Sequence, residues 1–215
     1  MNQKGRFITI EGGEGAGKST LISNLANWLS QHAISFCVSR EPGGTQIADS
    51  IRAIFSKPPV SEVLNSKTEL MLVSAARSQH VEHLLQPTLA KGTWIICDRY
   101  ADSTRVYQGD LGGIDPELIE RVINFTTNGL VPDLTFIMDC PVDIALKRLQ
   151  KRDKGRTTGA IRYDSASSEF HQKLRDAHLR LAKRFSDRIV LIDASHSPEE
   201  SLRQAIITMK ERFSI

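Results

Sequence analysis

The chain has 215 residues, of which 40% are hydrophobic and 25% are charged, and its formal net charge at pH 7 is +3. A chain of this length can bury one full core, and a charge this close to balance gives no field that would attract nucleic acid to a whole surface. No stretch approaches the roughly 18 apolar residues of a membrane-spanning helix, so we expect neither nucleic acid nor a membrane as a partner.

The N-terminal residues and the cysteines indicate a cytoplasmic protein. The first residues lead directly into a strand pattern, so we expect no signal peptide. Cys37, Cys97 and Cys140 are widely spaced and lie in or beside apolar runs. We interpret them as small core residues in a reduced compartment rather than as redox or metal-binding groups.

Five short apolar runs alternate with helical patterns along the chain. The runs cover residues 7–11, 34–39, 93–98, 134–139 and 188–193. Their length and apolar content are typical of parallel strands buried on both faces. The alternation predicts a three-layer α/β fold, in which ligands bind outside the carboxyl ends of the strands.

The helical patterns carry clear signals at their ends. Asp115 and Pro116 are typical of a helix start, and Asn128 with Gly129 is typical of a helix end. Ser197 opens the last helix in a capping pattern.

The stretch GGEGAGKS, residues 12–19, follows the first strand and precedes an amphipathic helix. It matches G-x-x-x-x-G-K-[ST], in which glycine backbone N–H groups and the helix N-terminus surround a phosphate chain. Lys18 is placed to reach the outer phosphates, and the Ser19 hydroxyl is placed to bind Mg²⁺. The motif predicts a nucleoside triphosphate site, but a GTP-binding switch, a motor and a small-molecule kinase all share it.

Two further stretches follow strand ends. They are REPGGT at residues 40–45 and DRYADSTRVYQG at residues 98–109. Arg99 can clamp a phosphate monoester through paired N–H groups, and the glycines of the first stretch expose backbone in a tight turn. Together they predict a second pocket, for an acceptor that carries a phosphate.

A basic stretch covers residues 148–163. The usual fate of such a charge run is a solvated loop. Beside a triphosphate site it also fits a mobile lid that closes arginines onto the transferring phosphoryl group and excludes water, which a kinase needs and a switch does not.

These motifs, in this order and followed by a late IDAS, resemble the thymidylate kinase family in its bacterial form, and the resemblance runs from about residue 5 to residue 213. It implies a P-loop kinase fold with a five-stranded parallel sheet, as a single domain over residues 1–215 with a lid at about 148–163. It also implies a homodimer that transfers a phosphoryl group from ATP, with Mg²⁺, to dTMP, giving dTDP and ADP in dTTP biosynthesis.

The resemblance also implies roles for individual residues. The residues expected to bind ATP are Gly12, Gly13, Glu14, Gly15, Ala16, Gly17, Lys18, Ser19, Thr20, Arg148, Arg162 and Ala194, with Ser19 also at the metal. The residues expected to bind dTMP are Glu14, Pro42, Val73, Arg77, Arg99, Thr104, Tyr107 and Gln108. The expected catalytic residues are Lys18, Arg99, Arg152, Glu14 and Asp98. Among these, Arg99 would hold the acceptor phosphate, Arg77 the thymine edge, and Tyr107 the deoxyribose.

Four positions depart from the family pattern, which are Gly15, Val73, Arg105 and Val106, and the last two stand where small residues are common. Some members carry an arginine where this chain has Gly15, so we expect the lid to supply the catalytic cation, from Arg152 first and Arg162 next. The family usually has a phenylalanine at the position of Val73, so stacking on the base is either reduced or supplied by another residue. Nothing in the sequence explains Arg105.

Two other function classes remain as alternatives. The stretch DLGG at residues 110–113 superficially matches a GTPase switch motif, but the chain has no N-K-x-D string to read guanine. A P-loop kinase for a deoxynucleoside or a small metabolite would not need Arg99 to hold an acceptor phosphate. His80 and His83 are three residues apart on an expected helix, where we expect surface or capping histidines rather than a metal site.

Overall fold

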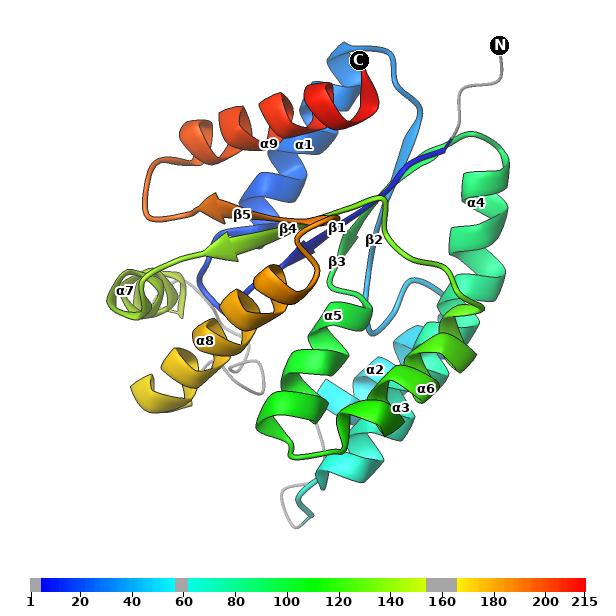
Figure 1. The fold of residues 1–215 in the computed structure, drawn as a ribbon, viewed down its shortest axis with the longest axis vertical. Helices are drawn as coiled ribbons and strands as arrows, with labels where there is room; N and C mark the ends of the chain where they lie inside the picture. The colour runs from blue at the N-terminus through cyan, green and yellow to red at the C-terminus, as the bar shows by residue number, and fades with distance from the viewer. Residues whose placement is uncertain (1–4, 57–61, 154–165) are drawn as a thin grey trace.

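Five parallel strands form the centre of the structure, a computed structural model that describes residues 5–56, 62–153 and 166–215 (Figure 1). The strands are β1 (Phe7–Glu11), β2 (Phe36–Arg40), β3 (Trp94–Asp98), β4 (Leu134–Asp139) and β5 (Ile189–Asp193). They pair in the order β2-β3-β1-β4-β5, and every pair is parallel. The five strands and the parallel sheet predicted from the apolar runs are confirmed.

Helices cover both faces of this sheet. The described helices are α1 (Lys18–Gln31), α2 (Gln46–Ser56), α3 (Ser66–His80), α4 (Gln86–Ala90), α5 (Ala101–Thr104), α6 (Pro116–Thr127), α7 (Val142–Asp153), α8 (Ser168–Arg184) and α9 (Pro198–Phe213), with π-helical turns η1 (Val81–Leu85) and η2 (Arg105–Leu111). In Figure 1, α1 and α9 lie together on one face, and α3, α5, α6 and α8 lie on the other. This is the three-layer arrangement that the alternating patterns predict.

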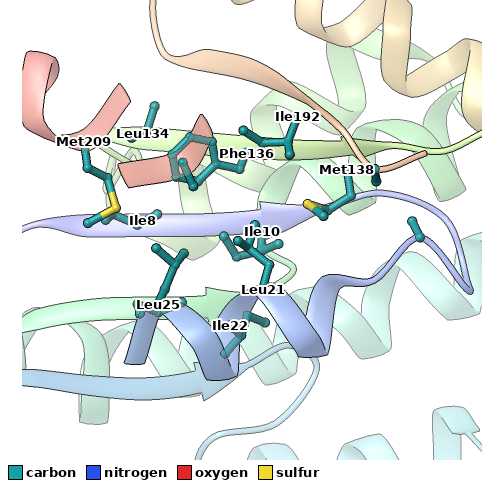
Figure 2. Packing of buried hydrophobic residues seen from close by; sticks show 14 of the residues in the cluster. Ile8, Ile10, Leu21, Ile22, Leu25, Leu134, Phe136, Met138, Ile192 and Met209 are labelled. Carbon is teal, nitrogen blue, oxygen red and sulfur yellow. The ribbon is translucent and has the colours of Figure 1, made fainter. Parts of the chain in front are cut away.

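The central strand β1 is held from both layers, because successive side chains of a strand point to opposite faces. Ile8 and Ile10 pack with Leu21 of α1 in one core cluster (Figure 2). On the opposite face, Phe7 meets the ring of Tyr100 edge to face, with 4.9 Å between ring centroids. The loop that leaves β1 therefore starts from a rigid base.

The helix ends predicted from sequence are confirmed in α6 and α9. The Asp115 side chain accepts hydrogen bonds from two backbone N–H groups in the first turn of α6. Asn128 ends that helix in the left-handed conformation, with φ of 49°. Ser197 caps α9 through its hydroxyl oxygen. These polar side chains satisfy terminal groups that a helix leaves without internal partners.

Arg105 forms ion pairs with acidic side chains that could not be identified from its position in the sequence. Its guanidinium donates to both carboxylate oxygens of Glu120, at 2.9 and 2.7 Å, and to Asp102 at 3.0 Å. Arg188 donates to both oxygens of the same Asp102, at 2.7 and 2.9 Å. Asp102 is 1% exposed, so its charge requires these partners. Arg105 thus links η2 to Glu120 of α6 and also neutralises part of the charge of the buried Asp102.

The three cysteines are free, with Cys97 and Cys140 buried and Cys37 half-buried. Cys97 and Cys140 are thus core residues as expected, whereas Cys37 lies only partly inside the core. None of the helices in the described ranges combines the length and apolar character needed to cross a bilayer.

The sheet register brings three chain segments to one edge. Arg40 at the end of β2 and Ile10 in β1 both pair with Asp98 at the end of β3. The segments that follow β1, β2 and β3 therefore leave the sheet side by side, at the edge where parallel sheets bind ligands.

Candidate active site

The loop from Gly12 to Gly17 joins β1 to α1 and has the geometry of an anion cradle. Gly17 has φ of 97°, a left-handed conformation that glycine adopts without strain, and Lys18 begins the helix directly after it. No side chain from the described ranges caps the N-terminus of α1, which leaves its first N–H groups for a ligand.

Lys18 lies against this cradle. Its Nζ donates to the carbonyl oxygens of Gly12 and Gly13, at 3.0 and 2.8 Å. Burial, reinforced by the charge of Arg99, lowers the pKa of Lys18 to about 8. The group therefore stays mostly charged at neutral pH and acts as the cation of the loop.

Gly15 is in close contact with helix α7. A side chain at this position would collide with the backbone carbonyl of Ala145, and Gly15 also has φ of +76°. An arginine here, as in some members of the family that the sequence resembles, would require α7 to move.

A cleft at the carboxyl ends of β2 and β3, here called the acceptor cleft, contains the second half of the site. It is lined by all eight residues expected to bind dTMP, which are Glu14, Pro42, Val73, Arg77, Arg99, Thr104, Tyr107 and Gln108. Asp98 also lines it. Residues from four widely separated segments of the chain thus meet in one cavity beside the phosphate cradle.

Arg99 joins the acceptor cleft to the cradle. Its Nη2 donates to Glu14 Oε1 at 2.7 Å, and its Nη1 donates to Ser103 Oγ at 3.3 Å. Tyr107 donates its hydroxyl to the same Glu14 carboxylate at 3.0 Å. Burial alone would raise the pKa of Glu14, but Arg99 and Lys18 outweigh burial and lower it. The Glu14 carboxylate thus accepts a hydrogen bond from the guanidinium of Arg99, the group that is expected to bind the acceptor phosphate.

Glu11 fixes the backbone around Arg99, a role that the sequence did not suggest. Its carboxylate accepts hydrogen bonds from the backbone N–H groups of Tyr100 and Ser103 at 2.8 and 3.2 Å, and from Ser103 Oγ at 2.6 Å. Arg99 itself has φ of 69°, a conformation that non-glycine residues rarely adopt. Burial raises the pKa of Glu11 to about 7, although Arg99 opposes the shift.

Arg77 is held on two sides and retains an unused donor. Its Nε donates to Glu41 Oε2 at 2.8 Å, and its guanidinium lies 5.3 Å from the ring centroid of Tyr100. The side chain is 2% exposed, and among the residues that the structure describes its Nη1 has no hydrogen-bond partner. A buried donor of this kind is costly unless a ligand accepts from it.

The expectation for His80 was wrong. His80 is fully buried, with its Nδ1 3.1 Å from Glu41 Oε1 and its Nε2 2.7 Å from Ser39 Oγ. His83, expected at the surface in the same way, is exposed. Spacing alone could not separate the two, because the partners of His80 come from a distant strand.

The remaining cleft residues combine polar and apolar character. Thr104 and Gln108 are buried, and Gln108 Nε2 donates to Glu69 Oε2 at 3.1 Å. Val73 provides an aliphatic wall without a ring, but Phe55 of α2 lines the same cleft. Helix α2, which had no expected role in binding, therefore contributes an aromatic side chain to the cavity.

Two oxygens near the cradle fit Mg²⁺. Ser19 and Asp98 line one cleft beside α1, and within residues 5–56, 62–153 and 166–215 the buried Asp98 Oδ1 has no hydrogen-bond partner. Across the described part of the chain, no group of three or more His, Cys, Asp or Glu forms a metal cage. Mg²⁺ is typically bound by one or two protein oxygens together with substrate phosphates and water, so these residues fit it.

A pocket on the other side of the cradle brings together further residues expected to bind ATP. Its lining includes Ala16, Gly17, Thr20, Arg148 and Ala194. Arg148 Nη1 donates to the carbonyl oxygen of Ala194 at 2.8 Å, so the guanidinium is held beside the loop after β5.

Two arginines were expected to supply the lid cation. Arg152 lies one turn beyond Arg148 near the end of α7 and is exposed. Arg162 lies outside the described residues, as does most of the expected lid.

The stretch at residues 110–113 does not support a GTPase switch. Asp110 lies at the end of η2 and pairs with Arg180 of α8 at 2.9 Å. A switch aspartate would have to follow a strand at the phosphate cradle, so this match to the motif has no structural counterpart.

Comparisons with known proteins agree on one family. The model of the thymidylate kinase family matches residues 10–206. A thymidylate kinase of Marinomonas sp. (strain MWYL1) is 42% identical over 196 residues, which cover 91% of this chain and 90% of the relative. Thymidylate kinases of Bradyrhizobium diazoefficiens and Oleidesulfovibrio alaskensis are each 41% identical, over 98% and 97% of this chain and 91% and 99% of their own lengths.

The raised pKa of Glu11 predicts a pH-dependent contribution to stability. Because folding raises this pKa from 4.5 to about 7, the folded protein holds the proton more tightly than the unfolded chain does. The stabilisation is therefore complete below the unfolded pKa and is lost as the pH rises through the folded pKa. Glu11→Gln removes this titration while preserving size.

The test is urea unfolding of both proteins at pH 5, 6 and 7. The free energy of unfolding of wild type minus that of Glu11→Gln should fall with increasing pH, by up to about 1.4 kcal/mol per pH unit. A difference that is independent of pH in this window would contradict the assignment.

Proposed function

The chain belongs to the thymidylate kinase family, and we propose that it transfers the γ-phosphoryl group of ATP to dTMP, giving dTDP and ADP for dTTP biosynthesis. The observation that carries the proposal is the contact between Glu14 of the phosphate cradle and Arg99 of the acceptor cleft. It supports a donor and an acceptor phosphate bound as neighbours, which phosphoryl transfer requires.

Each end of the acceptor cleft suits one part of dTMP. Arg99 offers a guanidinium to the phosphate. Arg77 Nη1, without a partner in the described part of the chain, offers a donor to a carbonyl oxygen at the edge of the base. Tyr107 contacts Glu14 and lines the cleft, and we assign its ring to pack on the deoxyribose and to disfavour a 2′-hydroxyl. An acceptor without a phosphate would have no group for the Arg99 guanidinium to bind.

The cradle residues suit the donor. Lys18 would balance the β- and γ-phosphate charges once they replace its two carbonyl partners, and Arg148 and Ala194 flank the space proposed for adenine. Phosphoryl transfer asks the protein mainly for positioning and for stabilisation of negative charge, so cations and backbone N–H groups are the groups that matter.

We assign Ser19 and Asp98 as the groups that hold Mg²⁺. The metal would neutralise charge on the donor phosphates during transfer. Asp98 Oδ1, which has no hydrogen-bond partner among the residues that the structure describes, supports this assignment. Asp98 also lines the acceptor cleft, so its carboxylate is next to the proposed path of the transferring group.

We also propose a cytoplasmic homodimer. Apolar side chains stay exposed on α2, α3 and α6, among them Ile54, Met71 and Phe125, and exposed apolar surface of this kind is typical of a protein interface. The free cysteines support a reducing compartment. Sedimentation should give twice the mass of one chain, and a single-chain mass at micromolar concentration would contradict the dimer.

A panel of acceptors tests the proposed reaction directly. ADP formation from ATP and Mg²⁺ is measured with dTMP, dUMP, dCMP, dGMP, UMP and thymidine, one at a time. We expect strong turnover with dTMP, weak turnover with UMP and none with thymidine, because thymidine gives Arg99 no phosphate to hold. Turnover with thymidine comparable to that with dTMP, or no turnover with any acceptor, would contradict the proposal.

Arg152 is our first choice for the lid cation, since this chain has Gly15 where some family members carry an arginine. Arg152→Ala should lower kcat more than it raises the KM for either substrate, because a contact made only in the transition state appears in kcat. Lys151→Ala, at the neighbouring exposed position, is the matched control and should leave kcat close to wild type. An effect confined to KM would assign the catalytic cation to another residue.

A further inference from the structure

His80 stands behind the acceptor cleft in a buried polar chain that the phosphoryl transfer itself does not use. The chain runs from Ser39 in β2 through His80 in α3 to Glu41, and from Glu41 to Arg77. All four residues are buried, with exposures of 8%, 0%, 4% and 2% in that order. His80 and Arg77 lie one turn apart on α3, so both reach the same carboxylate.

The two oxygens of the Glu41 carboxylate are divided between these two partners. Oε2 accepts from Arg77 Nε at 2.8 Å, and Oε1 lies 3.1 Å from His80 Nδ1. A carboxylate that faces a guanidinium alone commonly uses both oxygens and takes two of its N–H groups. Here Arg77 donates to Glu41 through Nε, and its Nη1, which lies on the opposite edge of the guanidinium from Nε–H, stays unpartnered within the described ranges.

The His80 ring cannot turn away from this arrangement without losing a bond on its other side. A carboxylate only accepts hydrogen bonds, so Nδ1 carries a proton, and in the neutral ring Nε2 accepts from the Ser39 hydroxyl at 2.7 Å. The turn after Glu41 also packs against the ring, because a Cβ atom added at Gly44 would lie 2.6 Å from His80 Nε2 and Cδ2.

We propose that His80 is a positioning residue for base recognition in the acceptor cleft. By holding one oxygen of Glu41, it fixes the carboxylate to which Arg77 Nε donates, and so holds the guanidinium in the orientation that offers Nη1 to an acceptor atom of a pyrimidine base. This inference rests on the proposed function, since it assigns the base-binding part of the same cleft.

The first experiment compares His80→Leu with His83→Leu, a matched control because His83 is exposed three residues further along the chain. In His80→Leu the KM for dTMP should rise about tenfold, while kcat and the KM for ATP change by less than about twofold. His80→Gln, which offers an amide N–H to Glu41, should recover part of the loss. His83→Leu should match wild type.

A double-mutant cycle separates positioning from general loss of structure. In an Arg77→Gln background the histidine has no arginine to position, so adding His80→Leu should raise the KM for dTMP no further. An unchanged KM in His80→Leu alone, an equal rise in the KM for ATP, or the same tenfold rise in the Arg77→Gln background would each overturn the proposal.

If His80→Leu does not fold, a milder variant can test the same proposal. Ser39→Ala removes only the hydroxyl that holds His80 Nε2, and it should raise the KM for dTMP about threefold, the effect expected for one weakened hydrogen bond. A KM equal to that of wild type would then overturn the proposal. Absence of dTMP-dependent turnover in wild type would instead contradict the proposed function itself.

Discussion

The site depends on the ion pair between Glu14 and Arg99, which are 2.7 Å apart at their closest atoms. Glu14 belongs to the loop after β1 and Arg99 to the residue after β3, and these strands are neighbours in the sheet. The pair therefore sets the distance between the phosphate cradle and the acceptor cleft. The contact orients the guanidinium of Arg99 toward the cradle. It also means that an acceptor phosphate would have to compete with the Glu14 carboxylate for the hydrogen bonds of Arg99.

Around this pair the protein places charged and polar groups where burial makes them costly. Glu11 supports the backbone of Arg99 from inside the sheet, and Glu41 supports Arg77 from the end of β2. The donor left on Arg77 and the oxygen left on Asp98 have no described partners. Such unsatisfied groups reduce stability but are ready to meet substrate without rearrangement, which is how preorganised sites stabilise developing charge.

Much of this arrangement could be predicted from local sequence. The five strands followed from apolar runs, and the ends of α6 and α9 followed from capping residues, because both signals act over a few residues. The supporting contacts could not be predicted in this way. Glu11, Glu41 and His80 act through partners between 36 and 92 residues away, and nothing in their neighbours shows which distant group they will meet. Arg105 was unexplained because its role depends on the burial of Asp102, which is paired with Arg188, 86 residues away.

We propose that Arg99 recognises the acceptor phosphate, and calorimetric binding tests that claim most directly. Titrations compare dTMP with thymidine, which lacks the phosphate, on wild type and on Arg99→Met. Wild type should bind dTMP roughly ten- to a hundredfold more tightly than thymidine, the range expected for hydrogen bonds to a charged group, and Arg99→Met should lose most of that preference. An undiminished preference in Arg99→Met would contradict the account.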